Sequence, residues 1–231
     1  MIKKITLLLT LLIILASASF GISKRSTYTN LTRQSDALNH ALVAELPENL
    51  VQNATDIMFD SLPDTPIIVR VTAAGIYTPY YGGGQQKAIV QEVYQGKNIH
   101  VGQTIQIATF RWCCIVEDSP SNSSSKTLYA EMSFVNRMQK GNDYLVFLDK
   151  KIDAFQTSDC IYMLADSNYL ISPVFSYDEH QNISIPVADD GNTYVNYLSV
   201  KDNEFFACTK KALSAMIKLK HTMIKLYPAK H

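Results

Sequence analysis

KAIVQEVYQGKNIHVGQTIQI, residues 87–107, is the stretch that decides the fold. Apolar and polar side chains alternate on both sides of a turn bounded by Gly96 and Gly102, a pattern typical of two half-buried strands. We expect the first strand over residues 87–96 and the second over residues 103–114. His100 lies in the turn between them, where we expect it to be exposed. The stretch therefore predicts two staves of a small barrel rather than a binding site.

The rest of the chain predicts a barrel flanked by helices. IIVRVTAAG (residues 67–75) is rich in β-branched residues, and DYLVFLDK (residues 143–150) is a short apolar run that we expect to pair with residues 128–138 across a turn. Weaker strand signals follow at 160–165, 170–177 and 193–200. Helical spacing over residues 34–62, interrupted at Pro47, predicts one or two helices, and a final amphipathic helix begins after Thr209, with Asn203 as the alternative cap. The fold class is therefore α+β, a small closed barrel of five or more strands with helices before and after it.

The first residues predict export. Lys3 and Lys4 precede an apolar run over residues 5–15, and Ala16-Ser17-Ala18 forms an A-x-A cleavage site. The run is shorter than the ~20 residues that span a bilayer, which favours a signal peptide over a retained anchor, the alternative. We expect a signal peptide over 1–18, a flexible mature N-terminus over 19–33 and a single domain over 34–231, secreted or at the cell-envelope surface.

Charge and motifs exclude several functions. The chain has 21 basic and 21 acidic side chains, so it lacks the positive surplus that nucleic-acid binding needs. No G-x-S-x-G elbow is present, and Asp178-Glu179-His180 lacks the H-E-x-x-H spacing of a zinc protease. Asp189-Asp190-Gly191-Asn192 lacks the spacing of a calcium loop and is typical of a turn. We therefore expect no enzyme activity, no catalytic residues, no metal and no cofactor.

Cysteine use allows disulfides in an exported chain. Adjacent cysteines in a strand point to opposite faces, so a bond between Cys113 and Cys114 would require distorted geometry. If two bridges form, each of these residues reaches either Cys160 or Cys208. The alternative is four reduced, buried thiols. A zinc site is disfavoured because the chain has no C-x-x-C pair.

These stretches together resemble the TIMP-like OB-fold domains of secreted bacterial proteins of unknown role. The resemblance covers residues 67–150, with Gln103 in place of the usual acidic residue and Asn142-Asp143 at the usual glutamate position. It implies an OB-like barrel and no particular activity. The animal inhibitors that lend the name use a free N-terminal cysteine on a protease zinc, whereas the first cysteine here is Cys113. The positions that carry the resemblance are Val90, Val93, Gly96, Val101, Gly102, Ile105, Gly141, Tyr144, Leu145 and Phe147.

The loop between the strands predicted at residues 67–75 and 87–96, which are the first two strands of the barrel in chain order, is the candidate binding site. Tyr77, Tyr80 and Tyr81 stand beside Gly82-Gly83-Gly84, and in OB-folds this loop borders the ligand face of strands two and three. Arg111 and Trp112 would add a cationic and an aromatic contact. The alternative is that Trp112 belongs to the core and the loop is only mobile.

The sequence thus predicts a non-catalytic binding module for an extracellular or envelope peptide, protein or glycan. The alternative is an extracellular protease inhibitor that lacks the N-terminal cysteine mechanism. We expect the C-terminal helix to pack on its own domain rather than on a membrane or a partner helix.

Overall fold

The fold is taken from a computed structural model of the chain. It describes residues 6, 10, 13–22, 41–44, 47–80, 83–109, 114–116, 128–131, 137–152, 160–165, 171–185 and 194–230. Residues 13–22 form a helix whose side chains are exposed. Among the helices in the described ranges, none is both long enough and apolar enough to cross a membrane.

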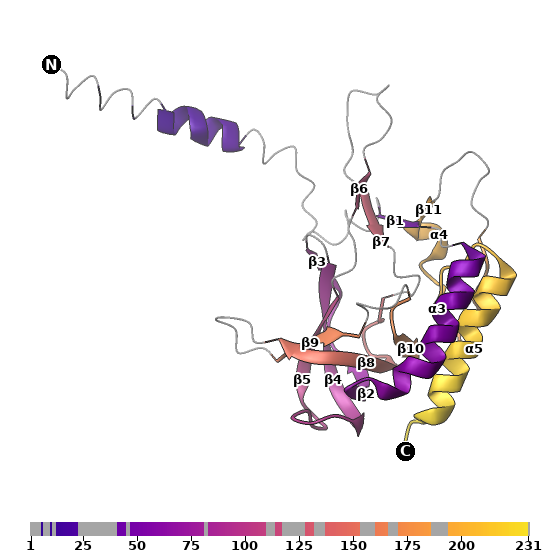
Figure 1. Cartoon of the computed structure of the whole chain (residues 1–231). Helices are drawn as coiled ribbons and strands as arrows, with labels where there is room; N and C mark the ends of the chain where they lie inside the picture. The colour runs from indigo at the N-terminus through magenta and orange to yellow at the C-terminus, as the bar shows by residue number, and fades with distance from the viewer. Residues whose placement is uncertain are drawn as a thin grey trace.

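A closed barrel forms the centre of the domain (Figure 1). Within the described ranges its wall is made of β2 (Ile67–Ala73), β4 (Gly83–Gln95), β5 (Thr104–Thr109), β9 (Ile161–Leu164) and β8 (Asp143–Ile152), in that order around the ring. The β5–β9 pair is parallel, and the other four pairs are antiparallel. The predicted class, α+β with a small OB-like barrel, is confirmed.

Two bulges in the β2–β4 pair bend this wall. The register shifts between Ile68 and Val69 and again between Arg70 and Val71, so β4 contributes an extra residue at each point. A bulge increases local twist and bends the strand. The 13-residue β4 can therefore pair with β5 through its first half and with β2 through its second half.

Two helices cover one side of the barrel. In Figure 1, α3 (Glu48–Ser61) and α5 (Lys210–Leu226) lie side by side against the region of β8 and β10 (Val174–Ser176). Residues 144–148 of β8 are all buried, which requires cover on both faces of the strand. The Phe147 ring packs edge-on against Phe175 and Tyr227, with centroids 6.0 and 5.8 Å away. The predicted packing of the C-terminal helix on its own domain is confirmed.

Thr209 caps α5, as predicted. Its side-chain oxygen accepts a hydrogen bond from the Ala212 amide at 3.1 Å, which satisfies one of the amides that a helix start leaves unpaired. The Thr209 hydroxyl also donates to Glu48 at the start of α3, over 2.7 Å. The cap thus fixes the two helices to each other at one end.

A second sheet stands beside the barrel. It orders β11 (Tyr194–Asn196), β1 (Ala41–Ala44), β7 (Leu128–Glu131) and β6 (Cys114–Val116), with a parallel β1–β7 pair. The remaining elements are β3 (Thr78–Tyr80), the 3-10 turn η1 (Leu62–Asp64) and α4 (Tyr197–Val200). Pro47 occupies the N-cap position of α3, so the interruption predicted there marks the start of that helix.

Two local predictions are wrong. Residues 41–44 were expected to be helical and form β1, because pairing with β7 and β11 outweighs the weak helical spacing of a four-residue apolar run. Residues 128–131 do not pair with β8 across the turn at residues 139–142. They pair with β1 and β6 instead, and the turn bonds to the end of β2 through Gly141 N to Ala73 O (2.8 Å) and Ala73 N to Asn142 O (3.0 Å).

Candidate functional site

The outer face of β4, β5 and β9 carries exposed and half-buried side chains. Along β4 the inward Ala88 and Val90 are fully buried, whereas Lys87 is exposed and Ile89 is only half-buried. On β5 the inward Ile105 and Ile107 are likewise buried. Of the outward side chains, Thr104 is exposed and Gln106 half-buried, whereas Ala108 is buried. We define the open strand face by its outward side chains on the three strands, namely Gln85, Lys87, Ile89, Thr104, Gln106, Ile161 and Met163.

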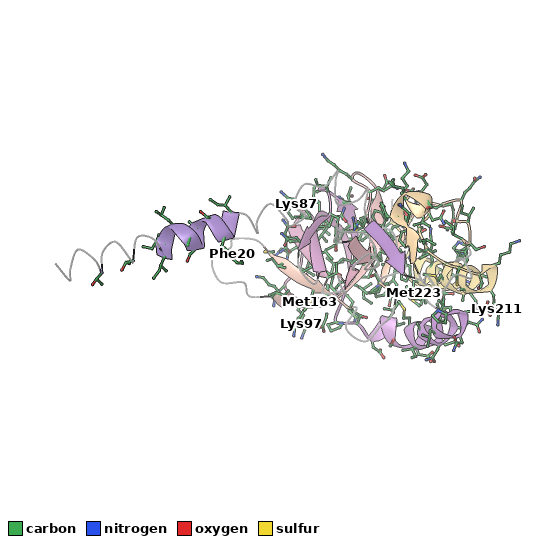
Figure 2. All side chains as sticks on the ribbon, turned by 90° about the horizontal axis from the view of Figure 1, so that it is seen from above. Phe20, Lys87, Lys97, Met163, Lys211 and Met223 are labelled. Carbon is green, nitrogen blue, oxygen red and sulfur yellow. The ribbon has the colours of Figure 1, made fainter. Side chains whose placement is uncertain are left out.

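Register places these side chains in rows across the three strands. Lys87 lies opposite Gln106, which lies beside Ile161 of β9. Ile89 and Thr104 form the neighbouring row. Figure 2 shows Lys87 and Met163 toward one side of the folded domain and Lys211 of α5 toward the opposite side. The open strand face therefore mixes apolar side chains with amides and one ammonium group, a composition that suits a polypeptide or a glycan.

The β3–β4 hairpin borders this face. Tyr80 pairs with Gly83, and Pro79 pairs with Gly84. The Tyr77 ring lies so close over Gly84 that a Cβ added there would meet the ring at 2.2 Å. A glycine at position 84 is therefore a packing requirement for the hairpin. Two positions further along, the buried Gln86 donates from Nε2 to Gly75 O at 2.9 Å and to Met138 O at 2.6 Å.

Tyr77 is an internal residue of the domain. Its exposed fraction is 8%, and the Arg137 guanidinium stacks on its ring at 4.2 Å from the centroid. The same guanidinium lies 5.5 Å from the ring of Tyr197 in α4. Arg137 thus joins Tyr77, just before the hairpin, to α4 by cation–π contacts. The face of the Tyr77 ring is used for packing, so it does not offer a stacking surface to a ligand.

The other predicted site residues remain predictions. Tyr80 lies in β3, where the structure describes only its backbone. Tyr81, Arg111 and Trp112 lie outside the described residues. So do Asp189 and Asp190.

The predicted disulfides also remain predictions. Cys160 and Cys208 are both half-buried and are not bonded to each other. Cys113 lies outside the described residues, and Cys114 is described only as backbone in β6. Among the side chains that the structure describes, no group of three or more His, Cys, Asp or Glu could hold a metal ion.

A charged cluster lies on the outer face of β2, β4 and β8. Arg70 donates from Nη1 to Glu92 Oε1 and from Nη2 to Asp143 Oδ2, both over 2.7 Å. Nε of Arg70 also donates to Asp143, at 3.0 Å. Burial alone would raise the pKa of Glu92. The Lys230 amide, the Tyr94 hydroxyl and the Arg70 guanidinium outweigh burial and lower that pKa.

Glu92 should make the unfolding free energy of the domain depend on pH. Because its pKa is lowered on folding, the stability that it contributes is fully present above its unfolded value near 4.5 and is lost as pH falls through the folded value. We expect the difference in unfolding free energy between wild type and Glu92→Gln to be largest above pH ~5 and to shrink toward pH ~3. Urea titrations at several pH values measure it, with Asp60→Asn on α3 as the control. A difference that grows on acidification would contradict the assignment.

Sequence reasoning missed a buried ion pair between Lys220 of α5 and Glu204, which lies in the connection between α4 and α5. Lys220 Nζ donates to Glu204 Oε2 and to Asp178 O, each over 2.6 Å, and the exposed fractions of the two side chains are only 3% and 4%. The Ser176 amide donates to the other oxygen of Glu204 at 2.7 Å. Burial raises the pKa of Glu204, and Lys220 and the Ser176 amide only partly offset it. The sequence does contain one sign of this pair, because Lys220 is a charged residue at a position of the apolar stripe of α5.

This ion pair borders a small hollow but does not form a catalytic arrangement. The hollow measures about 260 Å³ including its open part, and Arg137, His180 and Glu204 are among the residues that line it. His180 Nε2 lies 3.3 Å from Ser176 Oγ. Ser176 has an exposed fraction of 0%, and the Glu204 carboxylate binds Lys220 rather than His180. A serine nucleophile needs an accessible hydroxyl and a histidine oriented by an acid, so these residues serve packing.

The comparisons with known proteins add no family. Neither a protein-family model nor a characterised protein matches this chain.

Proposed function

We propose that the chain is an exported, non-catalytic binding module that holds a peptide, protein or glycan segment against the β3–β4 hairpin and the open strand face. The observation that carries the proposal is the contrast between β8, which is buried on both faces, and β4, whose outward side chains stay accessible. In OB-folds this face and the adjoining loop hold ligands. Half-buried Ile89, Ile161 and Met163 offer apolar area, and the amides of Gln85 and Gln106 offer hydrogen bonds.

Export is supported by the N-terminal sequence. Two lysines, an apolar run and the A-x-A site follow each other in the order of a signal peptide. The proposal also retains the TIMP-like resemblance. The stretches that carry it lie in β2, β4, β5 and β8, four of the strands of the barrel wall.

A charge reversal on the open strand face tests the proposal. Peptide and glycan arrays are probed with the full chain and with the Lys87→Glu, Gln106→Glu double variant. We expect the double variant to lose at least about tenfold in affinity for whatever ligand the wild type binds. Each new carboxylate repels acidic groups of the ligand and leaves the ligand's hydrogen-bond acceptors without a donor.

Two further variants locate the ligand. Tyr80→Ala with Tyr81→Ala examines the hairpin, and Lys218→Glu, an exposed position on α5, is the control on the other side of the molecule. If wild type and all three variants bind the same ligand equally, the ligand lies elsewhere and the proposal fails. It fails too if the wild type binds nothing on either array.

A further inference from the structure

The chain after α5 lies as an extended strap on the barrel. We call residues 227–230 the C-terminal strap. Its Tyr227 carbonyl accepts from the Tyr177 hydroxyl at 2.8 Å, and its Pro228 carbonyl accepts from the Tyr94 hydroxyl at 2.8 Å. At the far end, the Lys230 amide donates to Glu92 Oε1 over 2.7 Å. Polar side chains of the barrel thus reach main-chain groups along the whole strap.

The groups that hold the strap are fixed by the barrel itself. We call Arg70, Glu92, Tyr94 and Tyr177 the cradle. Arg70 is held by Asp143 and Glu92, and Asp143 also accepts from the Thr72 hydroxyl. The two tyrosine hydroxyls lie 3.0 Å apart, and the Arg70 guanidinium lies over the Tyr177 ring. A site that is ordered before its ligand arrives avoids much of the entropic cost of binding.

The cradle contacts the backbone of the strap and one aromatic ring, that of Tyr227. Arg70 Nη1 also donates to the Lys230 carbonyl, at 3.3 Å, so the cradle makes four hydrogen bonds to main-chain atoms of the strap. The Tyr227 ring packs 5.4 Å from Tyr94 and 5.8 Å from Phe147, whereas Pro228 and Lys230 are exposed. Proline has no amide hydrogen, so a carbonyl contact is sufficient at that position. The chemistry fits an extended segment in which an aromatic residue is followed by proline.

We propose that the cradle is a binding site for an extended peptide carrying an aromatic–proline pair, and that the chain's own C-terminal strap fills it in this structure. A peptide of the same chemistry competes with the strap in trans. The cradle lies on β2, β4 and residue 177, and none of its four residues belongs to the open strand face, so this inference does not depend on the proposed function. A tethered segment acts at an effective concentration of the order of millimolar, so the strap keeps the site occupied until its own contacts weaken.

A matched pair of strap variants in the full chain tests the proposal. Lys230→Pro removes the amide hydrogen that Glu92 accepts, whereas Lys230→Ala keeps it. The probe is a fluorescein-labelled Leu-Tyr-Pro-Ala-Lys peptide, and its binding is measured by fluorescence anisotropy. We expect Lys230→Pro to bind the probe about tenfold more tightly than Lys230→Ala, because the strap loses a hydrogen bond to a charged group. Lys97→Ala, at an exposed position after β4, should bind like wild type.

Cradle variants must then remove the gain. Tyr94→Phe with Tyr177→Phe is placed in the full chain that also carries Tyr227→Ala and Lys230→Pro, so that the strap has lost its ring contacts and its amide contact and competes little. Deleting both hydroxyl donors there should weaken the probe at least about tenfold. If circular dichroism shows that this chain does not fold, Arg70→Lys in the same background is the substitute, since it loses the forked geometry of the guanidinium. Equal binding by the two Lys230 variants overturns the proposal. So does binding that survives loss of the cradle groups, or no binding at millimolar probe.

Discussion

Replacing Lys220 by methionine should lower the free energy of unfolding by about 3–5 kcal/mol. The substitution leaves the Glu204 carboxylate 4% exposed and without its cation, and it leaves the Asp178 carbonyl without the ammonium donor. Removing one partner of a buried ion pair costs far more than the pair contributes, because the remaining charge is stranded in a poor solvent. Urea denaturation at neutral pH measures the loss.

Two companion variants separate charge from packing. Lys218→Met, also on α5 but exposed, should change stability by less than about 1 kcal/mol, since it gives up only a cation–π contact with Phe59. Adding Glu204→Gln to Lys220→Met should restore part of the loss, because glutamine stays neutral and still accepts from the Ser176 amide. A Lys220→Met loss no larger than that of Lys218→Met would show that the ion pair is not buried as described.

Phe147→Ala should destabilise the domain by about 3–5 kcal/mol. The Phe147 ring on β8 is fully buried, and it is in contact with Phe175 of β10 and Tyr227 of the C-terminal strap. Truncation leaves a cavity bordered by β8, β10 and the C-terminal strap. Because β8 is paired with β10 on one side and β2 on the other, it cannot move to fill that cavity. Thermal and urea unfolding should both report the loss.

Graded substitution distinguishes a cavity from a general surface effect. Phe147→Leu keeps most of the volume and should cost less than Phe147→Ala. Ile76→Ala, at a side chain that is 61% exposed, should change stability by no more than about 0.5 kcal/mol. Equal losses for leucine and alanine at position 147 would contradict the packing described for this ring.

The barrel wall could be predicted from the sequence because its information is local. Alternation in residues 87–107 and the β-branched run at residues 67–73 read directly as β4, β5 and β2, and the Thr209 cap followed from the residue type at a helix start. Burial of β8 on both faces was consistent with its continuous apolar run. Each of these patterns depends on neighbours within a few positions.

The features that escaped prediction depend on distant partners. Residues 41–44 form a strand only because β7 and β11 lie on either side of them. Tyr77 stood in a tyrosine–glycine loop that is typical of a binding surface, but Arg137, far along the chain, covers its ring. Sequence analysis assigned no role to Lys220, whose partners Glu204 and Asp178 lie 16 and 42 positions away along the chain. No local pattern encodes which long-range partner a side chain meets.

The central place of β1 in the second sheet has a consequence for the order of folding during synthesis. Leu42 lies opposite Asn196, so one side of β1 stays unpaired until most of the chain has been made. Chains grow at about 5–20 residues per second, and contacts this distant in sequence are the slow ones to form. The barrel strands up to β8 can assemble earlier, with β1 waiting as an open edge at which a nascent chain is prone to pair with the wrong strand.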